Sequence, residues 1–382
     1  MKMKKILSVV LSLAMAAMLS ITAFAEEPDS TAGFDMTKVG ISKILRVADG
    51  VDISSIQDFT FSFTGVNGNG TTALDAGNKN VTITVEDRAN GLAVGSKTFA
   101  DIFGDANNFD HAGEYVYNVK ETTKGFSSSD GNSEKSLEVD SSEYKVRVFV
   151  ANTPDGTGLV YKEVIVQKGD EKVDPTITER EYTEDPDNTK TITASDVKFV
   201  NTYKENVKGD NDIPVLRVVK YITGDYADKT MNFSVQVKFT IPDTATKDDV
   251  EVISKGTNRV KVAWQGKQGT FTTDLSDTES IEFTKIPAGT TFTVSEVQDE
   301  NYKSRITGFV ANPEVNFVAG NREDVPGAGP IVAKNNEVQI ENNSDTTVPT
   351  GLVINNWPYI AIVAAAVAGL AFLVVKKAAR KD

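Results

Sequence analysis

Cysteine is absent from the 382 residues of the chain, and histidine occurs once, as His111. The chain can therefore form no disulfide, no thiolate nucleophile and no zinc–thiolate site. A single histidine also argues against a Ser-His-Asp triad and against a metal site built from several imidazoles. Positive charge is scarce as well, because 40 Lys and Arg residues face 54 Asp and Glu residues, for a net charge of −14. Such a chain lacks the basic surface that binds phosphate, so nucleic acid is not expected as a partner.

Long uncharged runs occur at the two ends of the chain. At the N-terminus, residues 1–5 are basic, residues 6–22 are mostly apolar, and Ala23-Phe24-Ala25 fits the small-x-small rule of signal-peptide cleavage sites. An N-terminal membrane span is the alternative, but the apolar run is short and ends in this cleavage site. The pattern predicts a signal peptide over residues 1–25, and therefore a secreted product.

The C-terminal run covers residues 351–375, which contain no charged side chain. Trp357 and Tyr359 lie near its start, where aromatic residues mark a membrane interface. About 20 apolar residues are enough for a helix to cross a bilayer. The sequence therefore predicts a transmembrane helix followed by a cytoplasmic basic tail of Lys376, Lys377, Arg380 and Lys381.

Directly before this helix lies the motif Thr347-Val348-Pro349-Thr350-Gly351. A Pro-Thr-Gly motif, a hydrophobic helix and a basic tail, in this order, resemble the sorting signal of Gram-positive sortase substrates, in a variant of the commoner Leu-Pro-x-Thr-Gly. The resemblance implies that a sortase cuts between Thr350 and Gly351 and transfers the Thr350 carbonyl to an amine. A plain membrane anchor with a chance motif is the alternative.

The sequence between the ends consists of short runs in which apolar and polar residues alternate. This period of two predicts strands with one buried face, and the clusters of Gly, Asp, Asn and Ser between them predict turns. We expect a single short helical turn, at 98–103. The pattern favours an all-β chain of two tandem Ig-like β-sandwich domains, at 26–206 and 207–346, before a sorting signal at 347–382. The clearest strand candidates are residues 59–63, 81–85, 144–150, 160–166, 233–239, 260–264 and 338–340.

Six polar residues repeat in the same order in the two halves. Each half has a lysine in its opening strand, a glutamate at the end of a later strand and an asparagine at the end of its closing strand. Alternate residues of a strand share a face, and each of these six shares its face with apolar neighbours. Buried charges must be paired or neutralised, so buried salt bridges or strand-end residues are the plain interpretation. The two sets are Lys43, Glu121 and Asn201, and Lys220, Glu296 and Asn342.

A covalent bond is the sharper interpretation of these sets. Burial lowers the pKa of lysine and raises that of glutamate, so both can be neutral. A neutral amine is a nucleophile, and a protonated carboxyl can polarise the asparagine carboxamide and pass a proton to the leaving ammonia. The product is an isopeptide bond between Lys43 and Asn201, and another between Lys220 and Asn342, with Glu121 and Glu296 as catalysts. Each bond would form once, so the chain is not expected to be an enzyme with turnover.

The six residues and the terminal signals together resemble the T-antigen (FctA-type) major pilins of Gram-positive bacteria. The sequence segments that carry the resemblance include Leu216-x-Val-x-Lys220, Ile286-Pro-Ala-Gly289 and residues 342–351. The resemblance implies tandem Ig-like domains with one Lys–Glu–Asn triad each, subunits joined head to tail by sortase, and attachment to the cell wall. Its expected partners are a class C or housekeeping sortase, other pilin subunits, peptidoglycan and host surface ligands, with no metal or cofactor. Asn343 follows Asn342, and strand phase selects Asn342 as the acceptor.

The lysine that joins one subunit to the next has no strong motif in this family. Lys190 is our candidate, because it lies in a polar, turn-rich stretch before the closing strand of the first half, and Lys198 and Lys204 are the alternatives. Two other functions remain open at this point. One is a monomeric wall-anchored adhesin built from the same domains. The other is a surface glycosidase with paired carboxylates, which no motif supports.

Overall fold

The computed structural model describes residues 33–66, 76–89, 91–185, 188–210, 213–256, 258–311 and 318–345. The expected signal peptide and the expected sorting signal, with Val348, Pro349, Thr350 and Gly351, lie outside these residues. Within the described part of the chain, no helix is long and apolar enough to cross a membrane.

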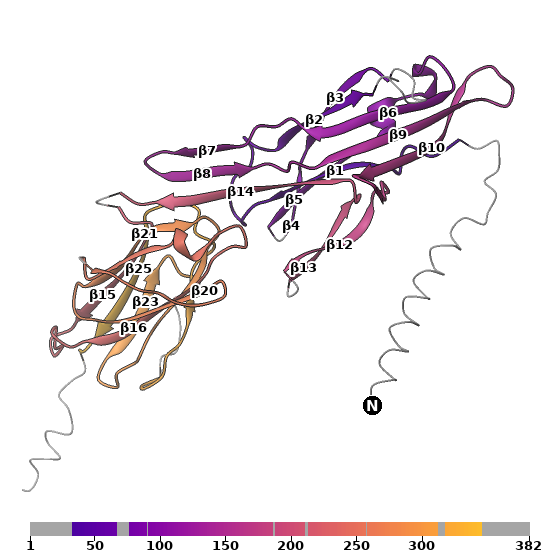
Figure 1. Ribbon diagram of the computed structural model, residues 1–382. Helices are drawn as coiled ribbons and strands as arrows, with labels where there is room; N and C mark the ends of the chain where they lie inside the picture. Colours follow the sequence, from indigo (N-terminus) through magenta and orange to yellow (C-terminus); the bar gives the residue numbers. More distant parts are fainter. Residues whose placement is uncertain are drawn as a thin grey trace, which may run out of the picture. The chain divides into compact units, whose positions relative to one another are not determined.

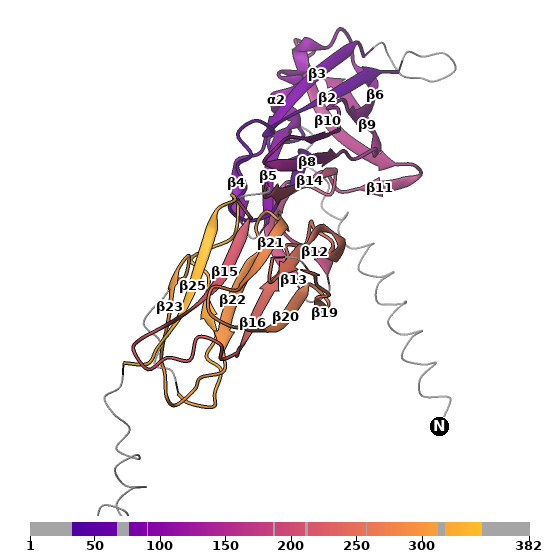
Figure 2. The ribbon, with the colours of Figure 1, turned by 90° about the vertical axis from the view of Figure 1, so that its left-hand side faces the viewer.

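The described residues form two compact units, and the chain passes from the first to the second for the last time between Tyr203 and Lys204, since the short segments Asp49–Val51 and Ser128–Glu134 are also grouped with the second unit. The sequence predicted this boundary after residue 206. Nearly all of the regular structure is β, with one short α-helix and two 3-10 turns among the described residues, so the expectation of an all-β chain is confirmed. Figures 1 and 2 show the strands of both units in two views.

The first unit has two sheets and a separate hairpin. One sheet has the order β4-β5-β1-β14, the other has the order β11-β10-β9-β6-β2-β3, and β12 pairs with β13. Aromatic side chains from the two sheets meet between them, since the rings of Phe61 on β2 and Phe199 on β14 are 4.9 Å apart. The bounds are β1 Gly40–Arg46, β2 Asp58–Gly65, β3 Asn78–Thr84, β4 Asp87–Ala89, β5 Leu92–Thr98, α2 Phe99–Phe103, η2 Ala106–Asn108, β6 Gly113–Glu121, β7 Phe126–Ser129, β8 Ser133–Glu138, β9 Glu143–Asn152, β10 Leu159–Lys168, β11 Glu171–Val173, β12 Thr178–Asp185, β13 Asn188–Ala194 and β14 Lys198–Lys208.

The second unit also has two sheets with an apolar layer between them. One contains β21, β15, β25 and β23 in this order, and the other has the order β19-β20-β16-β22-β24. Phe239 on β16 and Phe283 on β21 meet edge to face across the layer, with ring centroids 5.4 Å apart. The bounds are β15 Leu216–Thr223, β16 Phe233–Thr240, η3 Lys247–Asp249, β17 Glu251–Ser254, β18 Asn258–Arg259, β19 Ala263–Gln265, β20 Gln268–Leu275, β21 Ser280–Pro287, β22 Thr291–Glu296, β23 Lys303–Gly308, β24 Val325–Pro326 and β25 Asn336–Asn343.

Most predicted strands occur where the alternation placed them, and one does not. Residues 260–264 were expected to form a strand, but β18 ends at Arg259 and β19 begins only at Ala263. Both are short strands that follow the turn after β17, and the side chain of Trp264 is only half-buried, so alternation of apolar residues did not mark a buried strand here. The expected helical turn at 98–103 is present as α2, which Thr98 caps through its side chain.

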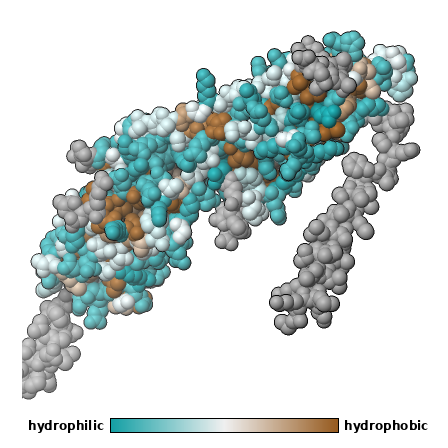
Figure 3. Space-filling model, viewed as in Figure 1, coloured by the Kyte–Doolittle hydropathy of each residue, from teal (hydrophilic) through white to brown (hydrophobic). Residues whose placement is uncertain are grey.

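Apolar side chains gather in the interior of each unit. Phe59, Phe61 and Phe63 on β2 are each at most 1% exposed, and the same holds for Val235 and Val237 on β16. On the face drawn in Figure 3, hydrophilic residues predominate and hydrophobic residues form small separate groups. Each unit therefore has the buried layer that the period of two predicted.

Candidate functional site

The first and last long strands of each unit are parallel neighbours. In the first unit β1 pairs with β14 so that Lys43 lies opposite Phe199, two residues before Asn201. In the second unit β15 pairs with β25 so that Lys220 lies opposite Ile340, two residues before Asn342. Since residues two apart share a strand face, each lysine lies diagonally beside its asparagine on the same face. The two units repeat this register without a shift.

The first cluster consists of Lys43, Glu121 and Asn201. Glu121 is the last residue of β6, in the sheet that faces β1 and β14. Its Oε2 accepts a hydrogen bond of 2.8 Å from Lys43 Nζ, and its Oε1 accepts one of 2.7 Å from Asn201 Nδ2. The side chains of Lys43 and Glu121 are both 0% exposed. The carboxyl group thus bridges the amine and the carboxamide in the buried interior of the unit.

The second cluster consists of Lys220, Glu296 and Asn342 and has the same plan. Glu296 ends β22, and its Oε1 accepts a hydrogen bond of 2.7 Å from Asn342 Nδ2. Lys220 Nζ lies 2.7 Å from Glu296 Oε2, but the two atoms do not meet in hydrogen-bond geometry. Both side chains are 0% exposed. Asn343, the neighbour that the sequence left as a competing acceptor, instead donates to Thr223.

A phenylalanine covers each lysine at the same place in the strand register. Lys43 Nζ lies 4.6 Å from the ring centre of Phe59, and Lys220 Nζ lies 4.3 Å from that of Phe233. The glutamate of each cluster pairs across the sheet with the residue two positions after the phenylalanine. Phe61 pairs with Glu121, and Val235 pairs with Glu296. The rings exclude water from the amines, which raises the free-energy cost of the charged form.

Burial shifts the ionisation of these groups. Loss of hydration lowers the pKa of Lys43 to about 8, although the charge of Glu121 opposes the shift. The pKa of Lys220 falls to about 8 for the same reason, against the opposing charge of Glu296. Burial also raises the pKa of Glu296, with the charge of Lys220 acting in the opposite direction. Both shifts favour the neutral amine and the neutral carboxyl group.

Sequence reasoning did not single out the residues around the triads. Phe59 and Phe233 were noted as strand residues, and their phase alone places them on the buried face. Asp140 lies between β8 and β9, and no pattern in the sequence marks it. Its backbone N–H donates a hydrogen bond of 2.8 Å to Asn201 Oδ1. Among the described residues there is no cluster of His, Cys, Asp or Glu that could hold a metal ion.

Lys190 has a different setting from the polar turn that the sequence suggested. It lies in β13, opposite Tyr182 of β12, and is half-buried. Tyr182 packs with Ile44 and Leu92, so the hairpin lies against the sheet that contains β1 and β5. Lys190 thus lies two residues beyond the Asp185–Asn188 pair of the hairpin, within the polar stretch that the sequence marked.

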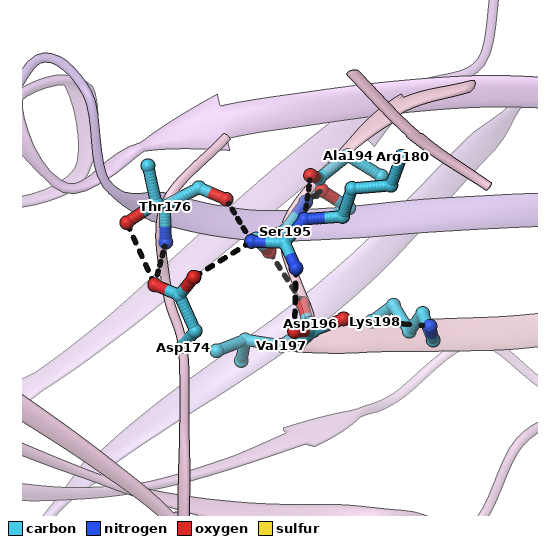
Figure 4. A network of polar contacts seen from close by, with 9 residues as sticks. Asp174, Thr176, Arg180, Ala194, Ser195, Asp196, Val197 and Lys198 are labelled. Atoms are coloured by element: carbon cyan, nitrogen blue, oxygen red, sulfur yellow. Dashed lines mark hydrogen bonds and ion pairs between the residues drawn. The ribbon is translucent and has the colours of Figure 1, made fainter. Parts of the chain in front are cut away.

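Arg180 anchors the same hairpin, as Figure 4 shows. Its guanidinium donates to Asp174 at 2.9 Å and to Asp196 at 2.5 Å, and its Nε donates to the carbonyl of Ala194 at 2.9 Å. The alternative Lys198 lies beside this network, with Nζ 3.7 Å from Asp196 and a side chain that is 36% exposed. Lys204, the other alternative, is half-buried on β14.

Two sequence families match the chain in adjacent segments. Residues 39–204 match a family described as Spy0128-like isopeptide containing domain. Residues 214–345 match a family described as a domain of unknown function, DUF7601. The first cluster therefore lies within the first match and the second cluster within the second match.

Individual relatives come from Streptococcus pyogenes. A pilin of serotype M1 is 25% identical over 190 residues, which make up 47% of this chain and 55% of that pilin, so the match spans about half the length of the curated relative. The crystal structure of a major pilin is 19% identical and covers 81% of this chain and 99% of its own, with a TM-score of 0.29. The major pilin T3.2 of serotype GAS13637 is 17% identical and covers 82% of this chain and 100% of its own, with a TM-score of 0.29.

Proposed function

We propose that the protein is a structural pilin subunit, because residues 39–204 match the family described as Spy0128-like isopeptide containing domain. Each of its two β-sandwich domains is stapled by an isopeptide bond, Lys43–Asn201 in the first and Lys220–Asn342 in the second. The observation that carries the proposal is the repeated, buried placement of one carboxyl group between an amine and a carboxamide.

The reaction needs only the three side chains of each cluster. The neutral lysine Nζ adds to the Cγ of the asparagine, and the bond from Cγ to Nδ2 breaks. The protonated glutamate gives its proton to the departing nitrogen, which leaves as ammonia, and the carboxylate takes back a proton from Nζ. The glutamate is unchanged at the end, and one amide replaces another.

A buried salt bridge is the plain alternative for each cluster, and the asparagine argues against it. A lysine and a glutamate could satisfy one another without a third group, yet in both units the second carboxylate oxygen receives a carboxamide Nδ2 at 2.7 Å. A buried ion pair often stabilises a protein less than hydrophobic residues of similar volume would, because removing two charges from water is costly. A covalent product removes both charges, which explains why two such clusters are tolerated where the side chains of the lysine and the glutamate are 0% exposed.

Intact mass tests the proposal most directly. The folded chain is expected to be lighter than its sequence mass by two ammonia molecules, one for each bond. Fragmentation of a digest should then recover peptides that contain Lys43 joined to Asn201 and Lys220 joined to Asn342. An unmodified mass for the folded protein would refute the bond and leave two salt bridges.

The rate of bond formation is expected to have a bell-shaped dependence on pH. In the second cluster the reactive state holds one proton shared by Lys220 and Glu296, so this pair titrates as a unit. Acid adds a second proton and makes the amine unreactive, and alkali removes the last proton, which the leaving ammonia needs. With the pKa of both lysines at about 8, the alkaline fall should lie near that pH. Timed mass spectra of refolding chain at several pH values would measure the profile, and a rate that keeps rising with alkali would contradict it.

The assembly that we propose uses the chain ends and a surface lysine. A class C or housekeeping sortase cuts between Thr350 and Gly351, holds the subunit as a thioester, and passes it to a lysine of another subunit or to peptidoglycan. The product is a covalent pilus on the Gram-positive cell wall. A monomeric wall-anchored adhesin is the less favoured alternative, because the curated relative is a pilin.

Lys190 remains the proposed acceptor, with a specific expected result. The Lys190→Ala variant, expressed in the native host, should lose the ladder of SDS-resistant polymers that the unmodified strain shows. Lys198→Ala and Lys204→Ala test the two alternatives, and Lys172→Ala on the exposed part of β11 serves as the control. Polymers that persist with Lys190→Ala would assign the role to another lysine. A single wall-bound species in the unmodified strain would favour the adhesin.

A further inference from the structure

The two clusters differ at the carboxamide oxygen. In the first cluster Asn201 Oδ1 accepts a hydrogen bond of 2.8 Å from the backbone N–H of Asp140. In the second cluster Asn342 is 0% exposed, and its Oδ1 has no hydrogen-bond partner among the described residues. The oxygen is the atom on which negative charge develops when an amine adds to a carboxamide, so this difference lies at the reacting group.

The carboxylate of Asp140 fixes the position of its own N–H. It accepts a hydrogen bond of 2.8 Å from the backbone N–H of Val200 on β14 and another of 2.7 Å from the backbone N–H of Ser142. Val200 immediately precedes Asn201, so the turn is tied to the strand that carries the reacting asparagine. The donor therefore moves with its acceptor and keeps the distance between them.

The second unit also has an aspartate between two strands, but it is tied to the strand of the lysine. The carboxylate of Asp277 accepts a hydrogen bond of 2.8 Å from the backbone N–H of Ile222. Ile222 lies on β15, the strand that carries Lys220. The N–H of Asp277 points to the carbonyl of Lys229, at 3.4 Å, and not to Asn342. A turn aspartate is thus present in both units, but only in the first does its N–H reach the carboxamide.

We propose that the backbone N–H of Asp140 is an oxyanion donor, with the Asp140 carboxylate as its positioning group, and that the Lys43–Asn201 bond consequently forms faster than the Lys220–Asn342 bond. The inference rests on the proposed function, since it concerns the rates of the same two reactions. When Lys43 Nζ adds to Cγ, the electron pair of the carbonyl moves to Oδ1 and is held by this N–H. When the carbonyl reforms, the Cγ–Nδ2 bond breaks and ammonia leaves with the proton from Glu121.

The same hydrogen bond also selects the orientation of the carboxamide. An N–H can bond to Oδ1 but not to Nδ2, so Asp140 turns Nδ2 toward Glu121, which must protonate it. In the second cluster Glu296 alone orients Asn342. The nucleophiles do not account for a difference, because both lysines have a pKa near 8 and both lie against a phenylalanine ring.

A reaction started by a pH jump tests the rate difference. The full chain, recovered unfolded, is refolded at acidic pH, where the amines are protonated, and is then brought to neutral pH. Samples quenched over time are digested, and the two linked peptides are counted from the same molecules. Loss of one oxyanion donor slows related reactions by about 100-fold or more, so the first bond should form at least about 10-fold faster than the second.

Three variants separate the donor from a general effect on folding. Asp140→Ala removes the positioning group and should slow the first bond toward the rate of the second, which serves as the internal reference. Asp140→Asn retains a side-chain acceptor and should keep most of the advantage, although it removes the negative charge that raises the pKa of Lys43. Asp277→Ala is the matched control in the second unit and should leave the first bond unaffected.

The outcomes distinguish this inference from the proposed function. Two bonds that form at equal rates in the unmodified chain overturn the inference alone, as does an unchanged ratio of rates in Asp140→Ala. Failure of both bonds to form overturns the proposed function, and the inference with it. A fast first bond that is slowed only by Asp140→Ala supports both.

Discussion

Replacing Glu121 with alanine is expected to leave Lys43 and Asn201 unlinked, so that the folded chain gains the mass of one ammonia. The carboxyl group contacts both reacting side chains, at 2.8 Å and 2.7 Å. General acid–base groups accelerate such reactions by about 100- to 10,000-fold. Intact mass after long incubation would measure the loss, and Glu296→Ala should give the same result for the second bond only.

Two further variants show whether the effect is chemical. Glu121→Gln keeps the size and a hydrogen-bonding end but cannot act as an acid, so it should also remain unlinked. Glu143→Ala, at an exposed position on β9, is the control and should keep the mass of the linked chain. Full linkage in Glu121→Gln would mean that the carboxyl group only positions the other two side chains.

Asn201→Ala is expected to lower the free energy of unfolding of the first domain by about 5 kcal/mol. The bond closes loops of roughly 160 residues in the first domain and 120 in the second, and the chain-entropy model for cross-links of that length gives about 5 kcal/mol each. For domains of this size such a loss corresponds to a melting temperature lower by roughly 10–20 °C. Asn201→Ala is preferable to Glu121→Ala here, because it leaves the buried Lys43 paired.

Calorimetry of the single variants would measure these shifts domain by domain. Asn342→Ala should affect the second transition by a similar amount, and the exposed Asn118→Ala on β6 should leave both transitions in place. If Asn201→Ala shows the unlinked mass but melts at the temperature of the unmodified chain, the bond does not contribute to equilibrium stability.

Strand phase was the informative part of the sequence. It placed Lys43 and Asn201 on one buried face without knowledge of which strands pair, and the same argument separated Asn342 from Asn343. The family resemblance was confirmed by the match of residues 39–204, whereas the motifs around Lys220 and Gly289 lie in the segment that matches a domain of unknown function. These predictions succeeded because the side-chain alternation of a strand is a local property.

Contacts between distant segments were not accessible to the same reasoning. The link from the Asp140 N–H to Asn201 Oδ1 depends on a turn whose backbone, not its side chain, makes the contact. Local composition also did not reveal that Tyr182 and Ile192 hold the hairpin of Lys190 against a sheet. The short strands β18 and β19 replace one expected strand for a similar reason, since alternation alone does not show which neighbours complete a sheet.

The parallel pairing of β1 with β14 also bears on the order in which the chain can fold. A polypeptide leaves the ribosome N-terminus first, so β1 is made early and its partner β14 only after nearly all of the first domain. Until then one edge of β1 lacks its neighbour, and Lys43 lacks the group with which it reacts. Pairing of such distant segments is intrinsically slow. The domain can therefore close only after its last strand has emerged, and a truncated chain would keep an open sheet edge that proteases and chaperones can recognise.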